Sequence, residues 1–217
     1  MKCFAIILLV LCCGSMRAQR ADFCATDFSK ADSIAAHYTA HSLKDLKMLA
    51  DKLCGPLPTE QEKFRAIYQW VCSNIEADYP LLMLNKHKRA TLKGDKLKRW
   101  NKTFNKKIFE TLVSEHKTVC TGYAYLVKEL AYHAGLSCTI INGYARHSGV
   151  DSTAIGPVNH SWNKIKLNNK WYVCDATWSS GVYSLTTAQF VKRYNDQFFL
   201  TEPSVFFKTH YAMESEK

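Results

Sequence analysis

Two strand-like segments joined by a two-residue turn constrain this chain most, because a tight turn determines which residues face each other. Residues 160–167 read HSWNKIKL and residues 170–178 read KWYVCDATW, with Asn168 and Asn169 between them. Asparagine tolerates the positive φ angles that such a turn needs. The two residues that flank the turn are then expected to pair, and every other pair follows by counting. The pattern therefore predicts an antiparallel hairpin with a defined register.

This register brings a histidine and a carboxylate together. Trp162 is expected opposite Asp175 and His160 opposite Thr177, and residues two apart on one strand share a face. His160 and Asp175 are then diagonal neighbours, roughly 7–8 Å apart at the backbone. Taken alone, such a pair is more often a structural hydrogen bond. The opposite face is apolar and is expected to face the core, with Cys174 turned away from His160; it carries Ile165, Leu167, Tyr172, Cys174 and Ala176.

A cysteine at the start of a predicted helix favours a catalytic interpretation of the His160–Asp175 pair over a structural one. In KTVCTGYAYL, Cys120 precedes a run of apolar residues at three- and four-residue spacing, which indicates one helix face. Gly135 is placed to end this helix in a left-handed conformation. Gly122 lies in the first turn and leaves room for close approach by a strand or a substrate. A helix N-terminus favours the thiolate, which is the reactive form of cysteine.

The three residues together have the composition of a catalytic triad. An imidazole beside a thiol can take its proton, and a carboxylate can hold the imidazole in the right tautomer. We expect the helix that begins at Cys120 to dock against the face that carries His160 and Asp175. None of the other cysteines and histidines has metal-ligand spacing, so neither a metal nor another cofactor is expected.

The remaining segments predict a mixed α+β fold. Residues 26–76 have helical character, and Thr59 with Glu62 forms a capping-box pattern before an apolar helix face. We expect Asp78-Tyr79-Pro80 to end that helix, since proline restrains the residue before it. Residues 137–145 read as a further strand.

The net charge of +10 is concentrated in one segment. Residues 86–107 contain ten Lys or Arg and one Asp, and they show no clean apolar period. We interpret them as an exposed loop or a frayed helix. Such a segment can attract an anionic surface such as phospholipid, acidic polysaccharide or nucleic acid, although a solvated charge run is the commoner outcome. No aromatic platform for specific nucleic-acid binding accompanies it.

The N-terminus predicts export. Residues 1–19 combine Lys2, a short apolar core from Phe4 to Cys13 and small or polar residues up to Gln19, as secretory signal peptides do. The apolar core is too short for a stable transmembrane anchor. The chain is therefore expected to be secreted or periplasmic. Six cysteines remain after residue 19 and disulfides would be permitted: Cys24, Cys54, Cys72, Cys120, Cys138 and Cys174.

Three motifs, in order, resemble the core of the transglutaminase-like superfamily, which shares a papain-like Cys-His-Asp arrangement. They are TVCTGYAYLVKELAYHAGL, then NHSWN, then KWYVCDATW. The upstream EKFRAIYQWVCSNIEADY and the downstream DQFFLTEPSVFFKTHY resemble flanking segments of secreted bacterial members. The resemblance covers roughly residues 30–210, and the three motifs are specific only in combination. Thr118 departs from the pattern, since it replaces a common glycine.

The resemblance implies roles for individual residues. Cys120 would be the nucleophile, His160 the general base and acid, and Asp175 the residue that orients the imidazole. The backbone N–H of Cys120 is the default oxyanion donor. Gly122, Tyr123, Trp162 and Trp178 would line the substrate cleft or pack around the site.

These residues predict one domain over residues 20–217, with a helical part at 20–76, the basic insertion at 86–107 and a catalytic core at 117–178. The implied activity is thiol-dependent acyl transfer on a peptide bond or a glutamine carboxamide of a protein or peptide substrate. By resemblance, hydrolysis is favoured over cross-linking. The alternative is an inactive relative that uses the same fold as a binding module.

Overall fold

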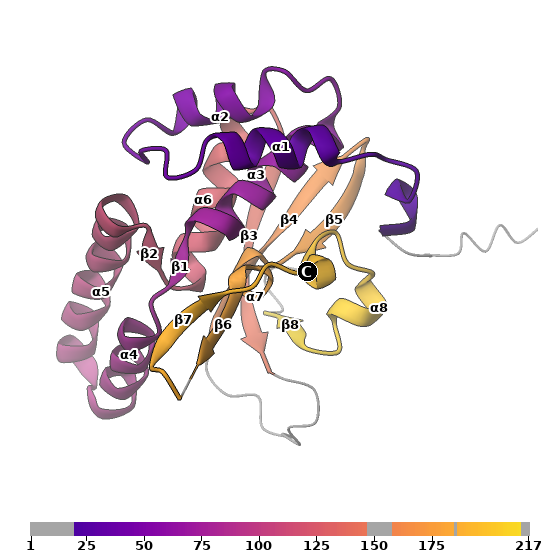
Figure 1. Cartoon of the computed structure of the whole chain (residues 1–217). Coiled ribbons are helices and arrows are strands. Elements are labelled where there is room, and N and C mark those ends of the chain that lie inside the picture. The colour runs from indigo at the N-terminus through magenta and orange to yellow at the C-terminus, as the bar shows by residue number, and fades with distance from the viewer. Residues whose placement is uncertain (1–19, 147–157, 185, 214–217) are drawn as a thin grey trace, which may run out of the picture.

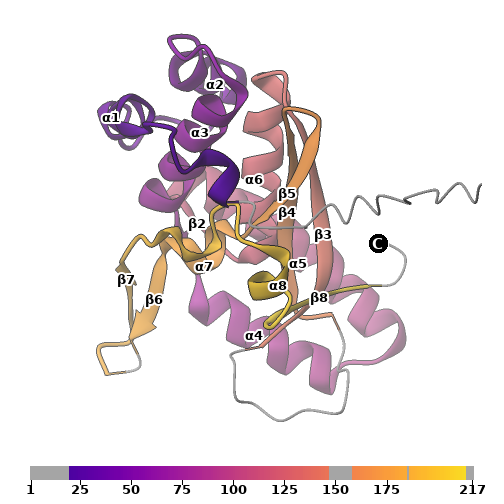
Figure 2. The same cartoon turned by 90° about the vertical axis from the view of Figure 1, so that its right-hand side faces the viewer.

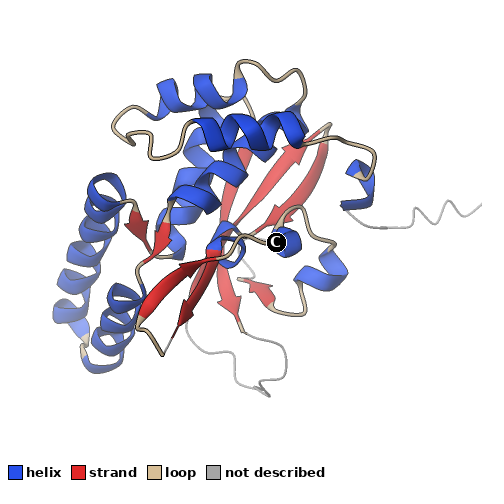
Figure 3. Cartoon of the chain, in the orientation of Figure 1, coloured by secondary structure: helices blue, strands red, loops and turns tan. Residues whose placement is uncertain are grey.

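The computed structural model describes residues 20–146, 158–184 and 186–213 of the 217-residue chain. The predicted signal peptide at 1–19 lies outside the described residues. Within the described ranges no helix is both long enough and apolar enough to cross a membrane. Figure 3 shows the mixture of helices and strands that the sequence predicts.

The N-terminal part is helical, as expected. After a short 3-10 helix its elements are α1 (Ser29–His37), α2 (Leu46–Cys54) and α3 (Glu60–Asn74). The predicted capping box is confirmed, because the Thr59 hydroxyl accepts from the backbone N–H of Glu62 and the Glu62 carboxylate accepts from the N–H of Thr59. This cap satisfies two donors that the helix itself leaves free.

The segment after α3 differs from the prediction. The helix ends at Asn74, and β1 (Glu76–Ala77) pairs in parallel with β2 (Lys117–Thr118). Asp78 then accepts from the N–H of Leu81 and caps α4 (Tyr79–Thr91). Proline fits the first turn of a helix, where its missing N–H costs nothing. The expectation that Asp78-Tyr79-Pro80 ends a helix was therefore wrong, because these residues begin one.

Of the two interpretations of the basic stretch, an exposed loop or a frayed helix, the structure shows a helix over most of its length. It lies within α4 and α5 (Gly94–Glu115), which form the helical hairpin at the lower left of Figure 1. A small separate core of Leu81, Phe104, Ile108 and Val119 holds the two helices. Its apolar residues are few and widely spaced, so the lysines between them obscure the helical period.

The central sheet has four antiparallel strands in the order β5-β4-β3-β8. They are β3 (Ser137–Ala145), β4 (His160–Leu167), β5 (Lys170–Cys174) and β8 (His210–Ala212). Asn168 and Asn169 have φ of 49° and 64°, as the predicted turn requires. Leu167 pairs with Lys170, so the predicted register is confirmed.

The second strand of the hairpin is shorter than predicted. The β4–β5 ladder ends where Asn163 pairs with Cys174, and residues 176–180 form the short helix α7 (Ala176–Ser180). The expected pairs of Trp162 with Asp175 and of His160 with Thr177 do not form. The chain continues through β6 (Gly181–Ser184), β7 (Gln189–Lys192), η2 (Asp196–Phe198) and α8 (Pro203–Phe206). Figure 2 shows the β6–β7 hairpin projecting away from the central sheet.

One face of the sheet is covered by helices, and the other is covered in part. Helix α6 (Cys120–His133) packs against the face that carries Ile165, Leu167 and Cys174, and α2 and α3 pack on α6 in the same core. A second cluster on the other face joins Trp162 to Phe206 of α8. The predicted core face is confirmed, but the expected docking face of α6 was wrong. The helix packs on the apolar face, and Cys120 meets His160 because it stands at the N-terminus of α6.

Candidate active site

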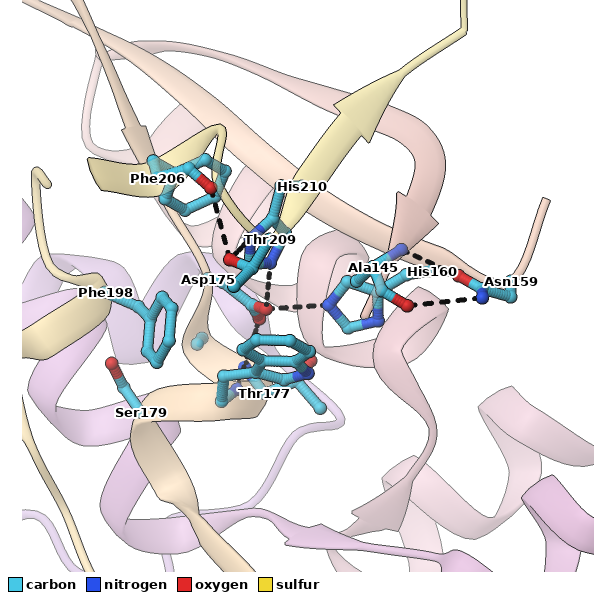
Figure 4. Close-up of polar contacts among 12 residues, drawn as sticks. Ala145, Asn159, His160, Asp175, Thr177, Ser179, Phe198, Phe206, Thr209 and His210 are labelled. Atoms are coloured by element: carbon cyan, nitrogen blue, oxygen red, sulfur yellow. Dashed lines mark hydrogen bonds and ion pairs between the residues drawn. The ribbon is translucent and has the colours of Figure 1, made fainter. Parts of the chain in front are cut away.

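His160 and Asp175 form a buried hydrogen-bonded pair. The Nε2 atom of His160 lies 2.7 Å from Oδ2 of Asp175, as Figure 4 shows. His160 is 7% exposed and Asp175 is fully buried. Because Nε2 faces the carboxylate, Nδ1 is the ring nitrogen left for proton exchange with another group.

Asp175 reaches this position as a helix cap. Its Oδ1 atom accepts from the backbone N–H groups of Thr177 at 2.9 Å and Trp178 at 3.2 Å, which begin α7. Its own N–H donates to the carbonyl of Phe198 at 3.0 Å. Aspartate is among the best N-cap residues because a carboxylate oxygen satisfies free amide donors. One carboxylate oxygen thus starts a helix while the other holds His160.

Cys120 is the first residue of α6 and lies against His160. Burial opposes the thiolate, but hydrogen bonding and charge from His160, together with a bond from the Ser161 backbone, outweigh burial and lower the pKa of the Cys120 thiol. The helix N-terminus acts in the same direction. Of the three residues predicted to form a triad, His160 and Asp175 are in hydrogen-bond contact, and Cys120 is near enough to His160 for the imidazole to lower the pKa of its thiol.

The electrostatics of the pair follow from its burial. Burial alone would lower the pKa of His160, but the charge of Asp175 outweighs it and raises that pKa. Burial alone would raise the pKa of Asp175, whereas His160, and to a smaller extent His210, hold it well below its usual range. A thiolate beside an imidazolium is therefore the state that this arrangement favours.

The pKa of four other thiols, the buried Cys54, Cys72 and Cys174 and the half-buried Cys138, is shifted in the opposite direction. Burial raises the pKa of Cys54 and of Cys138 to about 12. It raises the pKa of Cys72 and Cys174 well above the ordinary value. All six cysteines of the described ranges are free thiols. Of the five cysteines compared, four buried and Cys138 half-buried, Cys120 alone has a lowered pKa, because a neighbouring histidine, His160, favours its thiolate.

Two contacts hold the cysteine helix against the rest of the site. The side-chain amide of Asn163 on β4 donates to the carbonyl of Ala124 on α6 at 2.9 Å. Gly122 faces the buried Thr118, and a Cβ atom at Gly122 would lie 1.9 Å from Thr118 Oγ1. The expected close approach at Gly122 is therefore made by the chain's own β2 strand.

The three aromatic residues predicted near the site have different positions. Tyr123 is fully buried in the main core, and its hydroxyl donates to the carbonyl of Ile75 at 2.9 Å. It packs behind the site rather than lining a cleft. Trp162 is 1% exposed, with its ring centroid 6.1 Å from that of His160. The Trp178 ring lies 5.6 Å from the same imidazole.

A second histidine, which the sequence reasoning missed, contacts the same carboxylate. Nε2 of His210 lies 3.1 Å from Oδ2 of Asp175, and the residue is fully buried. Figure 4 shows both imidazoles directed at this oxygen. The signal available in the sequence was the segment DQFFLTEPSVFFKTHY, whose resemblance to the family was noted without a role for its histidine.

The ligand atoms of His160, Asp175 and His210 lie within 4.8 Å of one another, close enough to hold a metal ion. Sequence spacing gave no sign of this group. Hydrogen bonding accounts for it fully, since Oδ2 accepts from both imidazoles and Oδ1 accepts from two backbone amides. We therefore describe the group as a hydrogen-bonded cluster.

A family model and several known proteins match this chain. The family model described as the transglutaminase-like superfamily matches residues 47–176. Kyphoscoliosis peptidase of Mus musculus is 31% identical over 186 residues, which is 85% of this chain and 25% of that protein. Hillarin of Drosophila melanogaster is 25% identical over 206 residues, covering 88% of this chain and 22% of that protein.

The chain spans about a quarter of the length of these curated relatives. Among solved structures, the crystal structure of a TGase is 16% identical, with a TM-score of 0.45, and the match covers 81% of this chain and 37% of that one.

Proposed function

Since the chain belongs to the transglutaminase-like superfamily, we propose that it is a thiol-dependent acyl-transfer enzyme. One observation carries the proposal: His160 is hydrogen-bonded to the Asp175 carboxylate, and its proximity and charge lower the pKa of the Cys120 thiol. Thiol nucleophiles in enzymes are activated by such a base, which a third group orients.

In the proposed reaction the Cys120 thiolate attacks the carbonyl carbon of an amide and forms a C–S bond. The carbonyl oxygen becomes an oxyanion. The N–H of Cys120 is the candidate donor to it, because the first residue of a helix has no acceptor within the helix. Collapse of the tetrahedral species breaks the C–N bond, and His160 gives its proton to the leaving amine or ammonia. A thioester remains on Cys120.

The second half of the reaction uses the same imidazole. His160, now neutral, takes a proton from the acceptor as the acceptor attacks the thioester, and the thiolate leaves. Water as acceptor gives a carboxylate, so the enzyme is a peptidase or amidase. A lysine amine as acceptor gives a cross-link. We favour hydrolysis, because the mouse and human relatives carry the name peptidase.

Two measurements test the proposal. With Cys24 replaced by serine, since Cys24 is exposed, iodoacetamide near neutral pH should modify Cys120 faster than a free thiol, and His160→Ala should slow it. Mass spectrometry of a peptide library treated with the unsubstituted chain and with Cys120→Ala then separates cleavage, deamidation and cross-linking. Modification no faster than for a free thiol would leave the alternative, a binding module that retains the fold.

We also propose that residues 1–19 direct export of this enzyme. The intact mass of the protein recovered outside the cytoplasm should correspond to a chain that begins near residue 20. Recovery of the full-length chain only inside the cell would contradict it.

A further inference from the structure

His210 occupies a position that the proposed reaction does not use. It comes from β8, which lies beside β3 at the edge of the sheet, whereas His160 lies on β4. Its Nε2 atom lies 3.1 Å from the Asp175 oxygen that His160 contacts at 2.7 Å. The two imidazoles thus approach the same oxygen from different strands, with ring centroids 5.5 Å apart.

Aromatic rings surround His210 and fix the plane of its imidazole. It stacks on Phe206 at 4.0 Å between centroids and contacts Trp178 at 4.7 Å, with Trp162 and Phe198 beyond. Its Nδ1 lies 2.8 Å from the Thr209 hydroxyl, which also bonds the carbonyl of Phe206. The titratable groups that face the ring are Asp175 and His160. A buried imidazole needs partners for both nitrogens, and here both have one.

Sharing one oxygen has an electrostatic consequence. A carboxylate oxygen that accepts two hydrogen bonds forms a weaker bond with each donor, because its negative charge is divided between them. The orientation of the carboxylate does not depend on His210 alone, since Thr177 and Trp178 hold the other oxygen. Removing the His210 donor should therefore leave the carboxylate in place and strengthen its hold on His160.

We propose that His210 is a positioning residue that shares the Asp175 carboxylate with His160 and so limits how tightly that carboxylate holds the proton of the catalytic imidazole. A general acid and base must release its proton as well as accept it. It therefore works best when both the protonated and the neutral form of the imidazole are accessible at the working pH. The inference rests on the proposed function for its purpose, but its chemistry can be measured without a substrate.

The test is an NMR titration of ¹⁵N-labelled histidines in the Cys120→Ala chain, which removes the thiol and leaves the imidazoles. His210→Phe keeps a ring but no donor, and His210→Gln restores an N–H at similar reach. The pH midpoint of His160 should rise by about one unit in His210→Phe, which is the scale for one bond to a charged group. It should return close to the original value in His210→Gln. Phe206→Leu disturbs the packing of His210 but keeps its donor, and should leave the midpoint nearly unchanged.

An unchanged or lower midpoint in His210→Phe would overturn the proposal, as would an equal rise in Phe206→Leu. If His210→Phe does not fold, Thr209→Val provides the second test. It removes the partner of His210 Nδ1 and should raise the His160 midpoint by less, and no rise would count against the proposal. Fast alkylation of Cys120 with an unaffected His160 midpoint would support the proposed enzyme while rejecting this role for His210.

Discussion

Replacing Asp175 by asparagine separates the two roles of this residue, which are to cap α7 and to accept hydrogen bonds from two histidines. In the folded chain Oδ1 caps α7 through the amides of Thr177 and Trp178, and Oδ2 accepts from His160 and His210. Asparagine can keep an oxygen toward the amides, since asparagine and aspartate cap helices about equally well. It then turns an NH₂ group toward two imidazole nitrogens, and the charge that favours the imidazolium is lost.

The expected losses of stability and of alkylation rate in Asp175→Asn follow from these contacts. Bonds to a charged group stabilise by about 1.5–3 kcal/mol each, so the loss of two costs at most about 3–6 kcal/mol of unfolding free energy. The true cost is smaller because His160 can become neutral when the carboxylate is lost. Without the carboxylate the pKa of His160 falls, the thiolate of Cys120 loses its counter-charge, and alkylation at pH 7 should slow roughly 10- to 100-fold, the equivalent of one to two pH units.

The assay combines iodoacetamide kinetics across pH with urea unfolding, in the Cys24→Ser background. Asp175→Ala should slow alkylation as much as Asp175→Asn, and should cost about 1 kcal/mol more in unfolding because it also removes the cap. Asp45→Ala is the matched control. Asp45 is exposed and caps α2 by accepting from the N–H of Met48 at 2.8 Å, so its loss should cost about 1 kcal/mol without any change in alkylation. An Asp175→Asn chain that folds and alkylates at the original rate and pH profile would refute the reasoning.

Two further outcomes are expected. Gly122→Ala would place a Cβ atom 1.9 Å from Thr118 Oγ1, so it should lower the unfolding free energy by about 1–3 kcal/mol and slow alkylation of Cys120; unchanged values in both measurements would mean that β2 shifts freely. The contribution of His160, whose pKa is raised on folding, should be fully present below its unfolded value of roughly 6.5 and be lost as pH rises. That of Asp175, whose pKa is lowered, should be present above roughly 3.9 and be lost as pH falls. Urea unfolding from pH 3 to 9 should show the beginning of the Asp175 loss at the acid end and most of the His160 loss at the alkaline end, because the pKa of His160 is raised to about 10. A profile that is just as steep in Asp175→Asn would contradict the assignment.

The hairpin shows how far local sequence predicts the site. The two asparagines specify a turn, the turn sets the register, and the register identifies the face with Cys174 as the core. The same counting placed Asp175 near His160, which is correct, but through a strand pair that does not form. The residue reaches His160 because it caps α7, and a capping residue followed by a short helix resembles a strand when the flanking residues are apolar and aromatic.

Contacts between segments far apart in the chain could not be predicted from local sequence patterns. His210 contacts a carboxylate 35 residues earlier in the chain, and no local period relates the two positions. The α4–α5 hairpin was missed for another reason. Only a few apolar residues hold it, and the basic residues between them, which face solvent, dominate its composition.

Asp175 both caps α7 and binds His160, so its presence alone does not indicate activity. This affects which of Cys120, His160 and Asp175 is informative about activity. An inactive relative with this fold would still need a cap for α7, so selection on folding alone would retain an aspartate or asparagine at that position. His160 is partly tied to the same duty, because a buried carboxylate requires partners for its second oxygen. Cys120 has no comparable structural role, since another small side chain could fill the first position of α6. The thiol, and above all its reactivity at neutral pH, therefore distinguishes an enzyme from a binding module built on the same fold.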